Sequence, residues 1–512
     1  MSDNFFDFES DELLGGPAAP APRDSRHKPG TKSKPSTKAA PRNTSNLRAT
    51  NKFACGYVAL LAVVSAIPIG MNRPVFWLLF TGVISLSLLA YLMRSYQLDS
   101  QRTLRSYGQW KLISIALIVP IFALVQSIPV GPMFDVPFFE GPFNQVNQLQ
   151  LTMSTISLAP SASTTAALRY AGYIIFAILA FEAVGHQPRA KRFGVWIFWG
   201  VVAHALWGLV ALRMLGDIHF WGEKEYYLGS VTGVFINRNS FATFLAMGAC
   251  IGLALQLDKS SLPQQRKNRV RPLISPETVE RMPQWIGLAI IFVALLGTQS
   301  RMGLVAGLLG AFVILIAGLR KHDISWRSIF IVSFAGSFIA LSAGFILVGD
   351  GALERAVFLE SNIRGRLESY LLALDLIAER PLLGYGFDSF RIAFEQVQDA
   401  PMRMSLIWDR AHSTYLAHWV ELGLIVGTAP IILGGYVFYG LIKRLVRQET
   451  DYGMPLAALG ALVAGSVHSL VDFSLEMPAN VIMLIAIVVF GLSGRGPASS
   501  SSATPSEPET QK

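Results

Sequence analysis

The chain alternates between long apolar runs and short polar loops along almost its whole length. A helix needs about twenty consecutive, mostly apolar residues to cross the hydrocarbon core of a bilayer, and twelve runs come close to that length. The pattern therefore predicts an all-α polytopic membrane protein with about twelve transmembrane helices. The predicted spans are residues 53–69, 74–93, 111–130, 167–185, 193–213, 240–257, 284–299, 302–319, 327–348, 413–441, 454–470 and 478–494.

The loops between these spans are alternately rich and poor in Lys and Arg. Cytoplasmic loops of membrane proteins are enriched in both residues, so the basic N-terminal region places the N-terminus in the cytoplasm. Loops 131–166 and 468–478, which then lie on the other side, contain no Lys or Arg. We therefore predict that both termini are cytoplasmic and that the long loop 349–412 is outside. The predicted inside loops hold the basic residues Arg94, Arg102, Arg105, Lys111, Arg189, Lys191, Arg192, Lys259, Arg266, Lys267, Arg269, Arg271, Arg281, Arg320, Lys321, Arg327, Lys443, Arg444 and Arg447.

Polar segments frame and interrupt the membrane domain, which we place at residues 53–494. Residues 1–52 are rich in Pro, Ser, Thr and basic residues and too poor in apolar residues to form a core, so we expect a disordered basic cytoplasmic tail. Residues 495–512 predict a second disordered cytoplasmic tail. The loop 349–412 has seven Arg and no Lys, and the apolar residues within 367–377 recur at helical spacing. We expect this loop to form a partly helical cap.

Composition excludes several classes of function. Only 15% of the residues are charged and 52% are apolar, as in a membrane protein. The net charge of +9 comes mostly from short loops and the N-terminal tail, so it is a topology signal and does not indicate nucleic-acid binding. Cys55 and Cys250 lie inside apolar runs, which argues against an extracellular disulfide framework. The chain has no zinc-spaced ligand set, no GxxxxGK loop and no outward Asp-x-Asp, so we expect no cofactor and no metal.

Candidate functional residues gather where the spans meet the predicted outer face. Four groups lie there: residues 237–239, residues 299–301, His412, and His468 with Asp472. Ionisable groups next to hydrocarbon are costly and usually functional. Their common side is the strongest chemical signal in the sequence.

The arginine groups also have a structural interpretation. Arg238 and Arg301 either snorkel to lipid headgroups or clamp an anion, for which the planar guanidinium suits phosphate oxygens. Asn237 or Asn239 is expected to cap the helix that follows. The sequence leaves both interpretations of the arginines open.

The histidines and carboxylates likewise have both a structural and a functional interpretation. His412 is either a structural histidine or a catalytic one, and Arg410 beside it is expected to lower its pKa and keep it neutral. His418 is expected to be packed and hydrogen-bonded. Because His468 and Asp472 are four residues apart on one predicted helical face, we expect them to be able to hydrogen-bond to each other.

Five segments within residues 233–480 carry a resemblance through their order and spacing. They read GVFINRNSFA, TQSRMGL, RLESYLLALDLIAERPLLGYGFDSF, AHSTYLAHWVELGLIVG and HSLVDFSLEMPAN. This set resembles the O-antigen ligase and O-antigen polymerase family of bacterial envelope glycosyltransferases. In the ligases a His, a small polar residue, nine others and a Gly carry the pattern, here His412, Ser413 and Gly423. The resemblance implies a metal-independent inner-membrane enzyme whose active site faces the periplasm.

The resemblance also implies substrates and roles. The donor would be a glycan on undecaprenyl diphosphate and the acceptor a hydroxyl of a glycan or of the lipid A-core, in contact with membrane lipids and with no nucleic acid. We expect His412 to serve the acceptor as a base and Arg238 and Arg301 to hold the diphosphate. Substrate-binding candidates are Arg364, Arg366, Arg410, Asn239 and Ser413, and further catalytic candidates are Glu421, Asp388, His468 and Asp472.

Two alternatives stay open on the sequence alone. Ligase and polymerase are not distinguished, and a non-catalytic flippase of lipid-linked oligosaccharide or a polysaccharide exporter is a second class. A transporter places its ionisable residues near the bilayer midplane, between broken helices. Here these residues collect at one face of the membrane, which favours the enzyme.

Overall fold

The computed structural model describes residues 44–129, 155–258, 276–322, 352–398, 409–448 and 450–493, with six isolated positions between 324 and 336. Its named elements are all helical within these ranges. The long apolar helices are α1 (Thr44–Val64), α2 (Pro74–Leu98), α3 (Trp110–Ser127), α5 (Pro160–Val184), α6 (Gln187–Arg213), α7 (Arg238–Leu257), α8 (Pro276–Gly297), α9 (Arg301–Arg320) and α15 (Ala429–Arg447). The others are η1 (Ile69–Met71), η2 (Arg105–Gln109), α11 (Ala352–Glu379), α12 (Phe390–Val397), α14 (Thr414–Gly427), α16 (Gly453–His468) and α17 (Pro478–Leu492).

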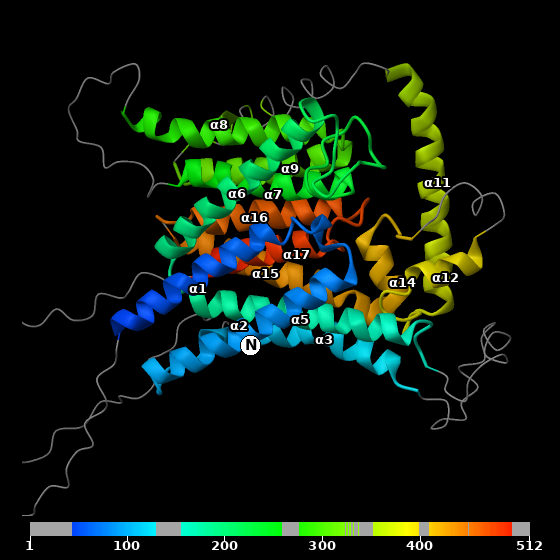
Figure 1. The fold of residues 1–512 in the computed structure, drawn as a ribbon, viewed down its shortest axis with the longest axis horizontal. Coiled ribbons are helices and arrows are strands. Elements are labelled where there is room, and N and C mark those ends of the chain that lie inside the picture. The colour runs from blue at the N-terminus through cyan, green and yellow to red at the C-terminus, as the bar shows by residue number, and fades with distance from the viewer. Residues whose placement is uncertain are drawn as a thin grey trace, which may run out of the picture.

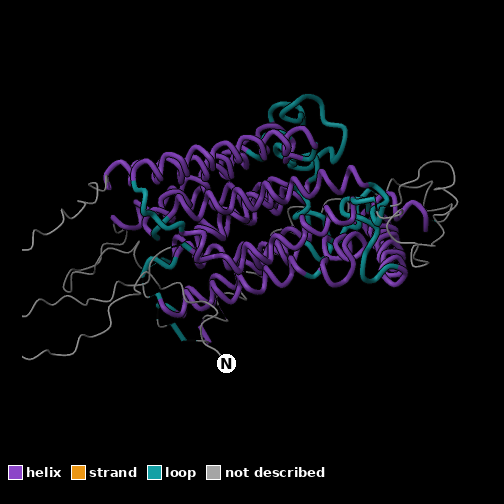
Figure 2. The backbone as a smooth tube through the Cα atoms, turned by 90° about the horizontal axis from the view of Figure 1, so that it is seen from below, coloured by secondary structure: helices purple, strands orange, loops and turns teal. Residues whose placement is uncertain are grey.

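The apolar helices form one bundle in which they run side by side (Figures 1 and 2). Among the described residues, nine helices are long and apolar enough to cross a membrane, and α16 and α17 are shorter apolar helices. The predicted all-α polytopic membrane fold is therefore confirmed. The predicted span 327–348 and most of both predicted tails lie outside the described residues.

The centre of the bundle is made by α7 and α16, against which α9 packs one face of small and apolar residues. In α7, 83% of the 18-residue apolar stretch that could cross a membrane is buried inside the protein. Nearly all side chains of α16 are buried as well. Small residues allow this close approach: a Cβ added at Gly310 would lie 2.6 Å from the carbonyl oxygen of Gly460. Because lipid tails are as apolar as the helices, such close packing is a main source of association. These helices therefore form a rigid base for whatever lies at their ends.

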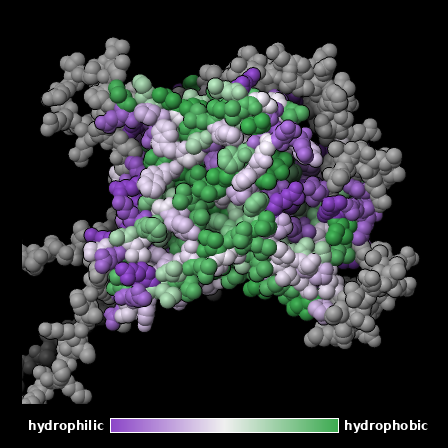
Figure 3. Space-filling view, in the orientation of Figure 1, coloured by the Kyte–Doolittle hydropathy of each residue, from purple (hydrophilic) through white to green (hydrophobic). Residues whose placement is uncertain are grey.

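The two ends of the bundle differ. One end, where α7 and α9 begin and α16 ends, carries α11, α12 and α14, and we call it the loop end. The opposite end holds basic residues of the predicted inside loops, including Arg102 and Lys191, which pair with Glu182 at 3.2 Å and with Asp258 at 3.3 Å. Figure 3 shows hydrophilic residues at both ends and a largely hydrophobic surface between them.

The predicted span 413–441 is wrong as a single helix. It forms α14 and α15, and α14 itself contains a break at Gly423, whose φ of 72° and ψ of 170° are not helical. A Cβ at Gly423 would lie 2.4 Å from the carbonyl oxygen of Leu382, and Leu424 donates its N–H to Pro381 O at 2.7 Å. The part of α14 before Gly423 ends there because the segment after α11 takes up its last carbonyl groups: Tyr385 N donates to Val420 O and Gly386 N to Glu421 O. Only α15 then has the length of a span.

Helix α11 lies across the loop end and runs transverse to the spans (Figure 1). It extends to Glu379, just before Pro381, so the predicted helical segment 367–377 and its stop are confirmed. Ala373 and Leu376 are buried against α14, whereas Leu367 is 58% exposed. The cap thus packs through one face of α11 onto α14.

Candidate functional site

The four polar groups singled out in the sequence meet at the loop end. Asn239 Nδ2 donates to Asp472 Oδ1 at 3.1 Å, which joins the start of α7 to the turn after α16. Thr414 N donates to Ser469 O at 3.0 Å, which ties the His412 region to the same turn. Gln299 Nε2 donates to Gly229 O at 3.0 Å in the loop before α7. The interpretation that these groups share one end of the bundle is confirmed.

His412 immediately precedes Ser413, the N-cap residue of α14. Its backbone is left-handed, with φ of 50°, a conformation that is uncommon outside glycine and clusters at functional sites. Tyr370 of α11 donates its hydroxyl to His412 O at 2.9 Å, and the imidazole packs edge-on against Phe473 at 5.3 Å between centroids. These contacts fix both the main chain and the ring.

The surroundings of His412 keep its imidazole neutral at neutral pH. Burial lowers its pKa first, and the positive charge of Arg366 lowers it further, against the opposing charges of Asp472 and Asp409. The prediction that Arg410 supplies this cation is wrong. Arg410 turns toward carboxylates on other segments, and Arg366 of α11 takes its place. Arg366 also donates to Val471 O at 3.3 Å.

Arg410 belongs to a partly buried charge network with Asp388, Glu476 and Arg169. It pairs with Glu476 at 2.8 Å and with Asp388 at 3.8 Å, and Arg169 of α5 pairs with Asp388 at 3.6 Å. Burial raises the pKa of Glu476, opposed by Arg410. Burial would also raise the pKa of Asp388, but Arg169 and then Arg410 outweigh it and lower that pKa. The network joins α5, the cap and the α16–α17 turn.

The sequence analysis missed Arg169 and Glu476. Arg169 is an ionisable residue inside an apolar run, which is itself a signal of function or pairing. Glu476 lies in the same turn after α16 as Asp472 but was not singled out. Both could have been found from their position alone.

Arg238 and Asn237 organise the start of α7. Asn237 Oδ1 accepts the main-chain N–H of Asn239 at 2.7 Å, so the predicted helix cap is confirmed. The guanidinium of Arg238 lies over the ring of Tyr227, with 5.4 Å from its central carbon to the ring centroid. Asn237 also donates to the Tyr227 hydroxyl at 3.0 Å. Tyr227 thus holds Arg238 at the loop end.

Arg301, Ser413 and Arg364 differ in how the structure places them. Arg301 is the first residue of α9, after the cap Ser300, and its side chain is exposed. Ser413 is buried and its hydroxyl accepts the N–H of Leu416 at 3.5 Å as the cap of α14. The backbone of Arg364 belongs to α11, and its side chain lies outside the described residues.

The expected pairing of His468 with Asp472 is wrong. Helix α16 ends at His468, so Asp472 lies in the following turn and not on the same helical face. His468 Nδ1 instead lies 2.5 Å from the hydroxyl of Thr243, while Asp472 accepts from Asn239 and Ser474. Each residue ties the end of α16 to a neighbour.

His418 and Glu421 stabilise α14 from inside. The two ring nitrogens of His418 lie 2.7 Å from Thr414 O and 2.9 Å from the hydroxyl of Tyr170, so the packed, hydrogen-bonded histidine is confirmed. Glu421 Oε1 accepts the main-chain N–H of Phe390 at 3.1 Å. Both side chains anchor α14, His418 to α5 and Glu421 to the start of α12.

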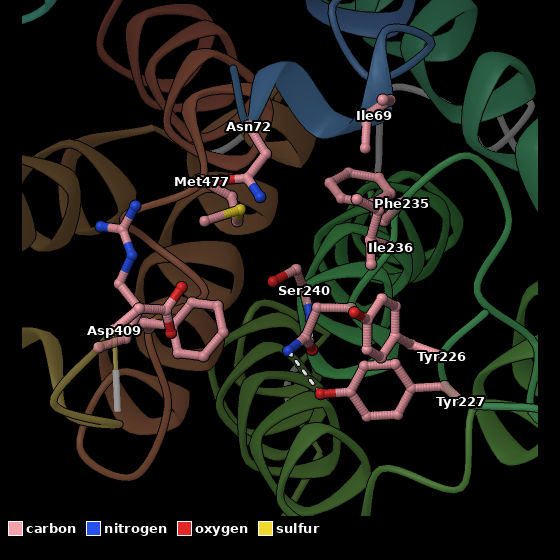
Figure 4. A pocket seen from close by; sticks show the side chains of 12 residues that line it. Ile69, Asn72, Tyr226, Tyr227, Phe235, Ile236, Ser240, Asp409 and Met477 are labelled. Carbon is pink, nitrogen blue, oxygen red and sulfur yellow. Dashed lines mark hydrogen bonds between the residues drawn. The ribbon is translucent and has the colours of Figure 1, made fainter. Parts of the chain in front are cut away.

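A cavity of about 220 Å³ opens at the loop end. Figure 4 shows Tyr226, Tyr227 and Phe235 along one side, and Asp409 and Met477 across from them. The α1–α2 connection and the start of α7 complete the lining. The cavity therefore collects residues from segments far apart in the sequence.

Two ring contacts connect this cavity to the catalytic candidates. Phe473, which lines it, packs against His412, and Tyr227, which also lines it, packs against Arg238. Through Phe473 and Tyr227 the cavity is thus one side chain away from the candidate base and from a candidate anion-binding arginine. Within the ranges that the structure describes, no group of three or more His, Cys, Asp or Glu residues could hold a metal ion.

Comparisons with known proteins agree with the resemblance seen in the sequence. Residues 286–432 match the model of the family described as O-antigen ligase. Over 339 aligned residues the chain is 21% identical to the exopolysaccharide production protein ExoQ of Rhizobium meliloti (strain 1021). The aligned region covers 64% of this chain and 70% of that protein. The family match runs from α8 into α15 and includes Arg301 and His412. The predicted resemblance is confirmed: residues 286–432 of this integral membrane protein match the model of the O-antigen ligase family.

Proposed function

We propose that this chain is an enzyme of membrane polysaccharide assembly that transfers a glycan from undecaprenyl diphosphate to an acceptor hydroxyl. The family match at residues 286–432 and the similarity to ExoQ support the class of enzyme. The observation that carries the proposal is the cavity whose lining residues Phe473 and Tyr227 contact His412 and Arg238. A base and a cation beside one cavity are what a transfer from a diphosphate leaving group requires.

The proposed step is a single displacement at the anomeric carbon of the donor sugar. The acceptor oxygen bonds to that carbon and gives its proton to the neutral imidazole of His412. The bond between the anomeric carbon and the diphosphate oxygen breaks, and undecaprenyl diphosphate leaves with the electron pair. His412 is suited to this role because burial and Arg366 lower its pKa and keep it unprotonated at neutral pH.

The arginines act on the leaving group. Negative charge grows on the diphosphate as the bond breaks, and fixed guanidinium groups stabilise that charge more than they stabilise bound substrate. Arg238 is held in place by Tyr227, and Arg366 by the carbonyl of Val471. Arg301 is exposed at the start of α9, where the side chain of Ser300 caps the helix. We assign the diphosphate to these three residues.

We place the loop end on the outer face of the bacterial inner membrane, with both termini in the cytoplasm. This follows from the Lys and Arg content of the loops at the opposite end. A lipid-linked glycan would then reach the site after it has crossed the membrane. The acceptor is a growing glycan or the lipid A-core.

The experiment that tests the function is chemical analysis of envelope glycans from a deletion strain. Chains of a single repeat would identify a polymerase, and full-length chains left on the lipid carrier would identify a ligase. Unchanged surface and lipid-linked glycans would contradict the proposal. Purified protein in detergent separates enzyme from exporter, because only an enzyme joins glycans where no membrane divides two compartments.

A further inference from the structure

We propose that the 220 Å³ cavity at the loop end is a saccharide subsite that holds one sugar ring of the glycan substrate. The inference rests on the proposed function for the identity of the glycan. Its binding test, however, needs no transfer activity. The proposed ligand of the cavity is a sugar ring and not the lipid diphosphate.

The first support is an aromatic wall. Tyr226 is 63% exposed beside the cavity, and Tyr227 is held by Asn237 and Arg238. A sugar ring presents a face of C–H groups that packs on an aromatic face, and Tyr adds a hydroxyl for hydrogen bonding. Figure 4 shows the two tyrosines on the same side of the cavity. This wall suits the flat face of a ring.

The second support is the polar lining opposite and below that wall. Ser240 is fully buried, and its hydroxyl has no hydrogen-bond partner within the part of the chain that the structure describes. Figure 4 shows Ser240 between the two sides of the cavity, with Asn72 and Asp409 also on its lining. A hydroxyl, an amide and a carboxylate offer the mixture of donors and acceptors that sugar hydroxyls need.

The charges of the lining argue against a phosphate ligand. Arg410 lines the cavity, but its guanidinium is paired with Glu476 at 2.8 Å and with Asp388 at 3.8 Å. Asp409 adds a negative charge to the same lining. A diphosphate placed here would face a carboxylate and a cation already compensated. A neutral sugar ring is not repelled by the Asp409 carboxylate and does not need an uncompensated cation.

The volume fits the same ligand. At about 220 Å³, the cavity is smaller than the roughly 300–1,000 Å³ of sites for drug-sized ligands. It has room for one ring and not for a long oligosaccharide. Because its walls contact His412 and Arg238, a ring bound here lies next to the proposed reacting groups.

The test measures saccharide binding by the purified full-length protein in detergent. The probes are short oligosaccharides released by mild acid from the strain's own surface polysaccharide, followed by saturation-transfer NMR and titration calorimetry. Tyr226→Ala should weaken binding about tenfold, the loss of one aromatic contact, and Tyr226→Phe should retain most of it. Tyr96→Ala removes a tyrosine of similar exposure, 68%, from α2 near the opposite end and should have no effect.

Two further measurements define the subsite. Asp409→Asn and Ser240→Ala should each weaken saccharide binding, while binding of inorganic pyrophosphate is unchanged in all variants. Equal saccharide affinity of wild type and Tyr226→Ala, no binding by wild type, or a pyrophosphate affinity that follows Tyr226 would each overturn the subsite. Saccharide binding that depends on Tyr226 in a strain whose deletion leaves glycans unchanged would support the subsite and reject the proposed function.

Discussion

Replacing His412 by glycine should remove most of the catalytic rate while leaving the fold almost as stable as before. His412 has a left-handed backbone, with φ of 50°, which costs a non-glycine residue about 1–2 kcal/mol. Glycine removes that cost. It also loses the edge contact with Phe473, about 0.5–1.5 kcal/mol, and adds chain entropy of roughly 0.5–1 kcal/mol. These contributions largely cancel, so the free energy of unfolding should change by about 1.5 kcal/mol or less.

The effect on activity should be far larger than the effect on stability. Loss of a general base typically costs about a hundred- to ten-thousand-fold in rate, which corresponds to roughly 2.7–5.5 kcal/mol in the barrier. Binding of the lipid donor should survive, because the arginines hold the diphosphate. The assay is glycan transfer by purified, reconstituted protein, with thermal unfolding measured on the same sample.

The pH profile gives an independent check. Because the pKa of His412 is lowered in the folded protein, wild-type activity should be constant near neutral pH and fall only below pH 6.5, the ordinary histidine value. Arg366→Gln removes a cation that lowers this pKa, so the acid limb should move to higher pH. His418→Gln, which breaks the contacts with Tyr170 and Thr414, should lower stability without moving the limb.

Near wild-type transfer by folded His412→Gly would refute the base assignment. Asp388, Glu421 or Asp472 would then be the next candidates. An acid limb that does not move in Arg366→Gln would show that another group titrates. A large loss of stability in the glycine variant would contradict the strain argument.

Three further predictions address the anion clamp, the topology and the break within α14. Arg301→Lys should lose most transfer activity at normal protein level, because an ammonium cannot reproduce bidentate contact with a diphosphate. Reporter fusions should be extracytoplasmic after Glu360 and cytoplasmic after Lys267, as the loop charges require. Gly423→Ala should destabilise the protein by more than about 1 kcal/mol in thermal unfolding, because its φ is 72° and a Cβ would lie 2.4 Å from Leu382 O.

Each of these has a control or a contrary outcome. Full activity of Arg301→Lys would assign Arg301 to lipid headgroups. The reverse pattern of reporter signals would place the loop end in the cytoplasm. Gly434→Ala in α15 is the matched control for Gly423, because a Cβ there meets nothing within 4 Å. Equal unfolding temperatures of the two glycine variants would contradict the account of the break.

Much of the fold was predictable because a bilayer allows few solutions. A segment in hydrocarbon must satisfy its own backbone hydrogen bonds, so apolar runs of sufficient length become helices wherever they occur. The helix at residues 367–377 was predictable from its spacing, and its end from Pro381. The end of the bundle at which the polar groups gather followed from the order of the spans. These features depend on local sequence and on counting crossings.

The break at Gly423 could not be read from the sequence. Both α14 and α15 are apolar, and Gly423 alone does not end a helix. The break depends on the carbonyls of Pro381 and Leu382, which α11 brings against α14. Such a contact between distant segments leaves no periodic signal.

The partners of the candidate site were likewise decided by the tertiary structure. Sequence adjacency suggested that Arg410 governs His412, but Arg410 is drawn to Glu476 and Asp388, and Arg366 acts in its place. Proximity along the chain fixes neither the direction of a side chain nor the charges it meets. The residue types therefore indicated the chemistry from the sequence alone, while the packing of α11 and of the turns at the loop end determined which charge faces which group.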